Sequence, residues 1–276
     1  MKHVLENCRE DDVEKIQIFL DTGINLRDLS DTQPTLLEAC LISLVEYRDN
    51  IFWPDDDTFN VFEFLLDQGA TISPGATLAL LIYAGGGAEI VQKLMKANAD
   101  VNGFFESQDS GSPTGLRSFT PLQAACGLGY WEFARDLLKK GAEVNAPARG
   151  ERGMTALQEA CAWEPWHEAE EGMKKLIRLL IDHGADVNAQ PVPDQGMTAL
   201  QIVAVRGDLD TAVLLLGHKA SINAPPGKDG YCALDGAAAE GRLDMVKILL
   251  NAHAVSYHRG SAGYDGAISL AEERGI

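Results

Sequence analysis

Residues 120–126 read Thr-Pro-Leu-Gln-Ala-Ala-Cys, and close copies follow at 155–161 as Thr-Ala-Leu-Gln-Glu-Ala-Cys and at 198–204 as Thr-Ala-Leu-Gln-Ile-Val-Ala. Weaker copies begin at positions 34, 76, 232 and 266. From position 120 onward the copies start 34 to 43 residues apart. Self-similarity at such a period is typical of repeat proteins, in which each unit packs only on its neighbours. The sequence therefore predicts a solenoid.

A second phrase closes each unit. It reads Gly-Ala-Glu-Val-Asn-Ala at 141–146, Gly-Ala-Asp-Val-Asn-Ala at 184–189 and Lys-Ala-Ser-Ile-Asn-Ala at 219–224. The opening glycine suits the end of a helix, because it accepts the left-handed backbone conformation without a Cβ clash. Lys219 and His253 stand at the same place in their units, where we expect them to cost some stability.

The stretch between the two phrases has the pattern of two short helices. The threonine that opens a unit can cap the first helix, and the small residues that follow let neighbouring helices approach closely. The second helix carries apolar residues at helical spacing, for example Phe133, Leu137 and Leu138. We therefore expect an all-α solenoid of helix pairs that are joined by β-turn or hairpin loops.

These units resemble the ankyrin repeat, whose signature is Thr-Pro-Leu-His-x-Ala in about 33 residues. The resemblance extends over nearly the whole chain and implies a single array of about seven to eight repeats over residues 1–276. The first repeat, at about 1–28, is degenerate and has the polar character of a cap. The remaining repeats are expected to start near residues 32, 74, 118, 153, 196 and 230, with a truncated repeat at 266–276.

The charge of the chain restricts its partners. Asp and Glu number 41 against 23 Lys and Arg, which gives a formal net charge of −18. Nucleic acid and anionic membranes are therefore unfavourable partners. The longest apolar stretch, at 78–83, is far shorter than a membrane span, and residues 1–11 lack the pattern of a signal peptide. We expect an intracellular, cytoplasmic protein.

Cysteines and histidines give no sign of a reactive or metal site. One slot of the first helix is filled by cysteine at positions 8, 40, 126 and 161 and by alanine at positions 204 and 238. A slot that alternates in this way is a packing position rather than a nucleophile. The six histidines lack the spacing of metal ligands on one helix face. We expect neither a metal nor a cofactor.

The family resemblance implies a binding surface on the concave side, formed by the turn tips and the exposed positions of the first helices. Transferred slot by slot, this predicts a largely apolar, aromatic groove with an acidic rim. Its residues are Leu41, Tyr83, Phe119, Met154, Glu159, Trp163, Met197, Arg206, Tyr231, Asp235 and Glu240, to which the inserted loop after Asn102 adds Phe104 and Phe105. The alternative is that several of these side chains pack against the next repeat.

Two functions are compatible with such a groove. The first is a scaffold that binds a protein or peptide with basic residues around an apolar centre. The second is a small-molecule-binding protein or an enzyme, in which the inserted loop 103–117 covers a pocket for an apolar ligand. Glu159 and Glu38 are its weak acid/base candidates. The sequence contains no recognised catalytic motif, which favours the scaffold.

Overall fold

The computed structural model describes residues 21, 60–70, 77–97, 99–105, 118–149, 153–163, 170–192, 196–227, 231–256, 268 and 271–272. These residues form eleven helices, labelled α4 to α14, and no strand among them. The predicted all-α repeat architecture is confirmed for this part of the chain. Contacts group the chain into two compact units, residues 1–106 and 107–276, and each unit is described by itself.

The first unit contains three of these helices. They are α4 (Asn60–Asp67), α5 (Thr77–Tyr83) and α6 (Ala88–Lys96). Helix α5 packs on α6 and is buried from Thr77 to Ile82. Lys93 of α6 donates a hydrogen bond of 3.1 Å to Oε1 of Glu63 in α4, and this bond raises the pKa of Lys93. An exposed pair of this kind contributes little to stability, so the unit is stabilised mainly by the packing of its apolar side chains.

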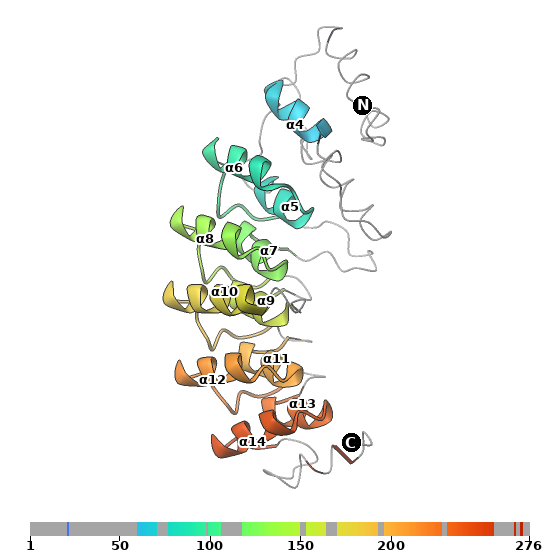
Figure 1. The fold of residues 1–276 in the computed structure, drawn as a ribbon, viewed down its shortest axis with the longest axis vertical. Coiled ribbons are helices and arrows are strands. Elements are labelled where there is room, and N and C mark those ends of the chain that lie inside the picture. The colour runs from blue at the N-terminus through green and yellow to red at the C-terminus, as the bar shows by residue number, and fades with distance from the viewer. Residues whose placement is uncertain are drawn as a thin grey trace. The chain divides into compact units, whose positions relative to one another are not determined.

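The second unit contains four helix pairs in succession. They are α7 (Pro121–Gly127) with α8 (Trp131–Lys139), α9 (Ala156–Ala162) with α10 (Glu170–Asp182), α11 (Ala199–Arg206) with α12 (Leu209–Gly217), and α13 (Ala233–Ala239) with α14 (Leu243–Asn251). Helices α7, α9, α11 and α13 contact one another in this order and form what we call the first row. The second helices of the pairs form the second row, which consists of α8, α10, α12 and α14 (Figure 1).

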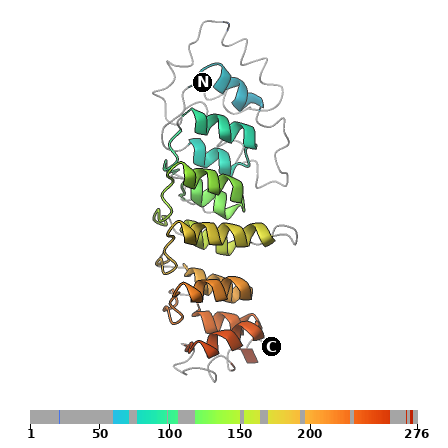
Figure 2. The same ribbon diagram turned by 60° about the vertical axis from the view of Figure 1, so that its left-hand side comes forward.

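The two rows differ in burial. In α13 all seven residues, Ala233–Ala239, are buried, whereas α14 buries only Met245 and Leu249. Small side chains at the helix contacts, such as Ala125 and Cys161, let the first-row helices approach closely. Helix α10, with 13 residues, is longer than α8, α12 and α14, which have 9 each (Figure 2). The first row is therefore the core of the unit, and the second row faces solvent on one side.

A glutamine closes each of the first three helix pairs in this unit. The side chain of Thr120 accepts a hydrogen bond from the backbone N–H of Gln123, and Oε1 of Gln123 accepts one of 2.8 Å from the N–H of Thr120. Nε2 of Gln123 donates at 3.0 Å to the carbonyl of Ala146, beyond the second helix. We call this arrangement the glutamine bridge. Thr155 with Gln158 and Thr198 with Gln201 repeat it, through the carbonyls of Ala189 and Ala224.

The last described pair, α13 and α14, makes an altered bridge. Sγ of Cys232 replaces the threonine oxygen and accepts from the N–H of Asp235 at 3.3 Å. The same sulfur donates to the carbonyl of Val255 at 3.4 Å. The carboxylate of Asp235, 3% exposed, accepts a hydrogen bond from the hydroxyl of Ser256. A different set of side chains thus joins the same two places in the repeat.

An asparagine links each turn to the next one. Oδ1 of Asn145 accepts from the N–H of Asp186 at 2.8 Å, and its Nδ2 donates to the carbonyl of Gly184 at 2.9 Å. We call this the asparagine clamp. Asn188 and Asn223 make the same clamp, with Lys219 and Ser221 and with His253 and Val255. The asparagine of each closing phrase therefore belongs to the contact between repeats.

The second residue after each second-row helix of this unit has a positive φ, as expected. Gly141 and Gly184 have φ of 89° and 84°, and Lys219 and His253 have φ of 66° and 64°. This conformation costs free energy in a residue that has a Cβ atom, whereas glycine adopts it without that cost. The clamp uses only the backbone carbonyls of Lys219 and His253, so it does not depend on which side chain stands there.

The glutamine bridge predicts a large effect for Gln158→Leu. The substitution keeps the side-chain volume but leaves the N–H of Thr155 and the carbonyl of Ala189 without their partner, which costs about 2–4 kcal/mol. Urea unfolding measures the loss. The matched control is Gln190→Leu, since the exposed Gln190 donates only to the carbonyl of Asn188. Equal losses in both variants would contradict the role of the bridge.

The positive φ values predict that Lys219→Gly stabilises the chain. Relief of the left-handed strain exceeds the entropy that glycine loses on folding, for a net gain of about 0.5–1 kcal/mol. The neighbouring His218 has φ of −92°, so His218→Gly provides the control and is expected to destabilise. Thermal unfolding of both variants tests this prediction. A lower melting temperature for Lys219→Gly than for the unchanged protein would show that the positive φ of Lys219 costs no stability.

Candidate functional site

The predicted groove residues fall into both units and partly outside the described residues. Leu41 and Glu38 lie outside them, as does most of the loop 103–117. In the first unit, Tyr83 and Phe104 are half-buried, and Phe105 is buried at 8% exposure. Phe105 is therefore a core residue here rather than an open contact. The other predicted residues belong to the second unit.

Four predicted residues precede the capping residues of the first-row helices. Phe119, Met154, Met197 and Tyr231 stand directly before Thr120, Thr155, Thr198 and Cys232. Met154, Met197 and Tyr231 are half-buried, so part of each apolar side chain is exposed. Phe119 is only 5% exposed and belongs to the core. Its neighbour Ser118 pairs through the backbone with Arg149, in an isolated antiparallel β-bridge. Three successive repeats thus present an apolar side chain at the same turn position.

Glu159 lies in the middle of α9 and Trp163 directly after this helix, one helical turn further along, and both are half-buried. The N–H of Trp163 donates to the carbonyl of Glu159 at 3.0 Å, so both side chains belong to the same face of the helix. A Cβ on Gly127 would lie 2.8 Å from Oε2 of Glu159, and one on Gly129 would lie 2.3–2.5 Å from three atoms of the Trp163 ring. The two side chains therefore rest on the turn that follows α7. We call them the Glu159–Trp163 pair.

Sequence reasoning missed these two glycines. Gly129 has φ of 71°, which favours glycine by itself, but Gly127 is the last residue of α7 and has no such need. The signal in the sequence is the phrase Gly127-Leu128-Gly129 itself, because it places two residues without side chains at the end of one repeat's first helix. Only the packing of α9 on α7 shows what the missing side chains make room for.

Arg206 joins neighbouring repeats. Its Nη1 donates to the carbonyl of Cys161 at the end of α9 and lies 4.0 Å from Sδ of Met173. Arg242 repeats the contact one repeat later, with Nε donating to the carbonyl of Val205 at 3.2 Å. A cation at the C-terminal end of a helix is favourable, because the last carbonyls lack partners. Arg206 thus stabilises the stack.

Two acidic groove candidates have different surroundings. Glu240 is exposed directly after α13, where it can form part of an acidic rim. Asp235 is buried in the altered bridge with Ser256 and cannot meet a partner there. The slot comparison identified the helix position of Asp235 but not its depth.

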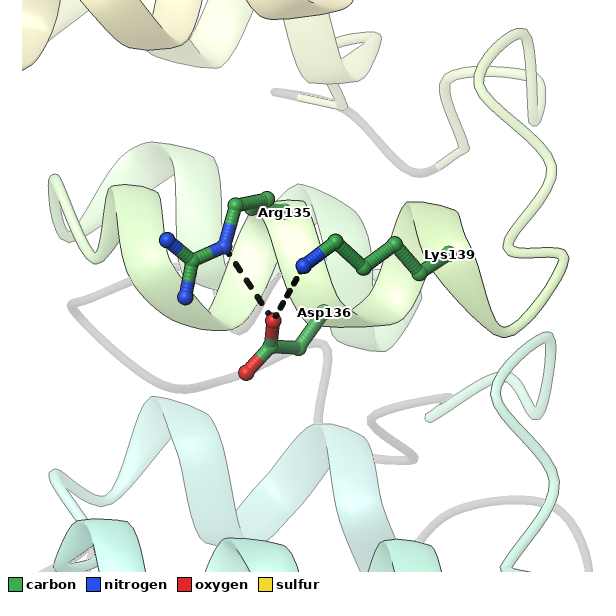
Figure 3. A network of polar contacts seen from close by, with 3 residues as sticks. All are labelled: Arg135, Asp136 and Lys139. Carbon is green, nitrogen blue, oxygen red and sulfur yellow. Dashed lines mark hydrogen bonds and ion pairs between the residues drawn. The ribbon is translucent and has the colours of Figure 1, made fainter.

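The second row carries ion pairs that are partly exposed to solvent. Oδ1 of Asp136 lies 3.2 Å from Nε of Arg135 and 3.6 Å from Nζ of Lys139, all on α8 (Figure 3). Nζ of Lys174 lies 2.6 Å from Asp210, which joins α10 to α12 and lowers the pKa of Asp210. Such pairs add little stability but keep this surface well solvated.

The two described cysteines of the packing slot are fully buried in the first row. Burial raises the pKa of the Cys126 thiol well above its usual range. Burial also raises the pKa of Cys161 to about 12, helped by Asp208 and opposed by Arg206. Because the thiolate is the reactive form, neither side chain acts as a nucleophile near neutral pH.

A search of the residues that the structure describes finds no group of three His, Cys, Asp or Glu side chains that could hold a metal ion. No described helix is long and apolar enough to cross a membrane.

The sequence matches a family model described as ankyrin repeats, in three copies, over residues 78–190 and 166–259. These stretches cover more than half of the chain. A search of the curated proteins found no match.

The raised pKa of Cys161 predicts a pH dependence of stability. A folded-state pKa above the unfolded value contributes stability below pH 8.5 that is lost as the pH rises toward 12. At pH 10 the loss is roughly 1.5–2 kcal/mol. The variant Cys161→Ala carries the residue that the next repeat has in this slot, Ala204. It should not show the part of the stability loss that comes from ionisation of Cys161. Urea unfolding of both proteins at pH 7 and pH 10 tests it, and parallel losses would contradict it.

Proposed function

Since the chain belongs to the ankyrin-repeat family, we propose that it is a scaffold that binds a protein or peptide through the turn tips and first-row helix ends. Ankyrin repeats generally mediate binding between proteins, and solenoids present extended surfaces for it. The observation that carries the proposal is the row of partly exposed apolar side chains at Met154, Met197 and Tyr231. Large apolar groups repeated on one surface are a common feature of contact sites.

The rigidity of the turns supports this function. Each glutamine bridge fixes the start of a first-row helix against the end of its repeat, and each asparagine clamp fixes one turn on the next. A surface that is ordered before binding loses little conformational entropy on binding. The partner can therefore be an extended segment that becomes ordered on the scaffold.

The charge of the chain supports a basic partner. The net charge is −18, and two acidic residues, Glu159 in the middle of α9 and Glu240 directly after α13, are at least partly exposed. Such a surface attracts cations over several ångströms and raises the association rate at low salt. We propose a partner with basic residues around an apolar centre, and no nucleic acid. A cytoplasmic location and a single array of seven to eight repeats also remain predictions.

The scaffold is favoured over the small-molecule or enzyme alternative. Glu159, the described acid/base candidate, lies on the turn after α7 beside Trp163. The buried thiols Cys126 and Cys161 remain protonated near neutral pH. The thiols therefore supply no nucleophile, and the absence of a recognised catalytic motif in the sequence favours the scaffold.

The proposal predicts where a partner can be cross-linked. The photoreactive amino acid p-benzoylphenylalanine at position 197 is expected to capture the partner in cells, for identification by mass spectrometry. The same residue at position 213 is the control, because Val213 is 56% exposed on second-row helix α12. Capture of the same proteins at both positions would contradict a binding surface at the turn tips.

Calorimetry with the identified partner then tests single residues. Tyr231→Ala and Met197→Ala are each expected to weaken binding at least tenfold, or about 1.4 kcal/mol, because each removes an apolar contact. Val213→Ala and Leu243→Ala, on second-row helices, are expected to change the affinity less than twofold. Loss of binding only in these controls would place the partner on the second row and refute the proposal.

A further inference from the structure

We propose that the partner segment at the turn tips is a polyproline II helix, which places an apolar side chain at every third position against Met154, Met197 and Tyr231. We call these three residues the turn-tip row. The inference rests on the proposed function and names the backbone conformation and the sequence pattern of the partner. It follows from the distance at which the repeats of the second unit are stacked.

The members of the turn-tip row occupy equivalent places in their repeats. Each stands directly before the residue that caps a first-row helix. The caps Thr155, Thr198 and Cys232 have nearly the same backbone conformation, with φ between −69° and −65° and ψ between 160° and 166°. The row therefore has the same spacing as the helices that its members precede.

This spacing follows from the packing of α9, α11 and α13. Helix α11 contacts both of the others, and the three helices lie one above another and roughly parallel in Figures 1 and 2. Small buried side chains, such as Cys161, Ala204 and Ala238, allow a close approach. Packed helices have axes about 8–10 Å apart, so successive members of the row are expected at about this distance.

Among the regular backbone conformations, polyproline II matches this distance best. It has three residues per turn and rises about 3.1 Å per residue, so residues i and i+3 share one face about 9.3 Å apart. A β-strand repeats its face after two residues, at about 6.6–6.8 Å. An α-helix repeats its face after seven residues, at about 10.5 Å, but its residues i+3 and i+4 would then fall between two members of the row.

The row also limits the length of the partner's motif. One repeat before Met154 the same position is occupied by Phe119, which is only 5% exposed. A partner side chain that reaches this position meets a buried residue and gains little contact. The motif therefore needs apolar residues at i, i+3 and i+6, and a further one on the side of Phe119 should add little affinity.

The chemistry of the row suits such a segment. Methionine is unbranched and adapts to the shape of its partner, and the ring of Tyr231 presents a flat apolar surface to leucine or proline. A proline-rich segment adopts polyproline II before binding, so it loses little conformational entropy. Positions i+1 and i+2 point away from the row, where the net charge of −18 favours lysine or arginine.

Synthetic peptides test the spacing on the full chain. The probe consists of three copies of lysine-proline-leucine and a closing lysine, so that leucine stands at every third position. A second peptide has the same composition with leucine at every second position. Fluorescence anisotropy is expected to show at least tenfold tighter binding of the first peptide. Equal affinities would show that charge alone attracts both peptides and would overturn the inference.

A double-mutant cycle tests the register of the bound peptide. The middle leucine faces Met197 whichever way the peptide runs. Replacing this leucine by alanine and combining it with Met197→Ala should therefore lose less free energy than the sum of the two single changes. Val213→Ala, on second-row helix α12, is the control and should change the affinity less than twofold. Additive losses with Met197→Ala would overturn the register, provided that thermal unfolding shows each variant to be folded.

The outcomes also distinguish the inference from the function on which it rests. Tighter binding of a helix-forming peptide with leucine at i, i+4 and i+7, lost in Met197→Ala, would overturn the polyproline II partner and leave the scaffold intact. No binding of the probe peptide, together with a partner cross-linked at position 197 and not at 213, would do the same. If neither a peptide nor a cross-linked partner depends on Met197 or Tyr231, both proposals fail.

Discussion

The second unit depends on side-chain amides that satisfy backbone groups between repeats. A helix of seven residues leaves most of its own N–H and C=O groups without intrahelical partners, because the first four donors and the last four acceptors are unpaired. The first-row helices α7, α9 and α13 have this length, and they are buried. Buried polar groups must find partners. The glutamine bridges supply them at the start of α7, α9 and α11, whereas the asparagine clamps join the more exposed turns.

This solution determines where the chain can vary. Most residues inside the first-row helices are buried by close packing, whereas Met154, Met197 and Tyr231, which precede three of the caps, are partly exposed. Glu159 in α9 and Trp163 directly after it are partly exposed as well. Substitutions at these exposed positions therefore leave the glutamine bridges in place, because the bridges use other residues of the same repeat.

Sequence reasoning predicted the features that depend on local chemistry. The threonine caps, the left-handed residues at Lys219 and His253, and the packing role of Cys126 and Cys161 follow from helix ends and small-residue slots. Depth was harder to predict, because exposure depends on the size of side chains in the adjoining repeat. Phe105, Phe119 and Asp235 were for this reason placed on an open surface, although they are buried. The surface that includes the other groove residues remains a proposal.

The asparagine clamps also have a mechanical consequence. Each clamp spans one boundary between repeats, with the amide in one repeat and its two backbone partners in the next. A load along the second unit therefore acts, at each of the three described boundaries, on a pair of hydrogen bonds on the turn side in addition to the helix packing. Two neighbouring repeats separate there only when both bonds of the clamp break.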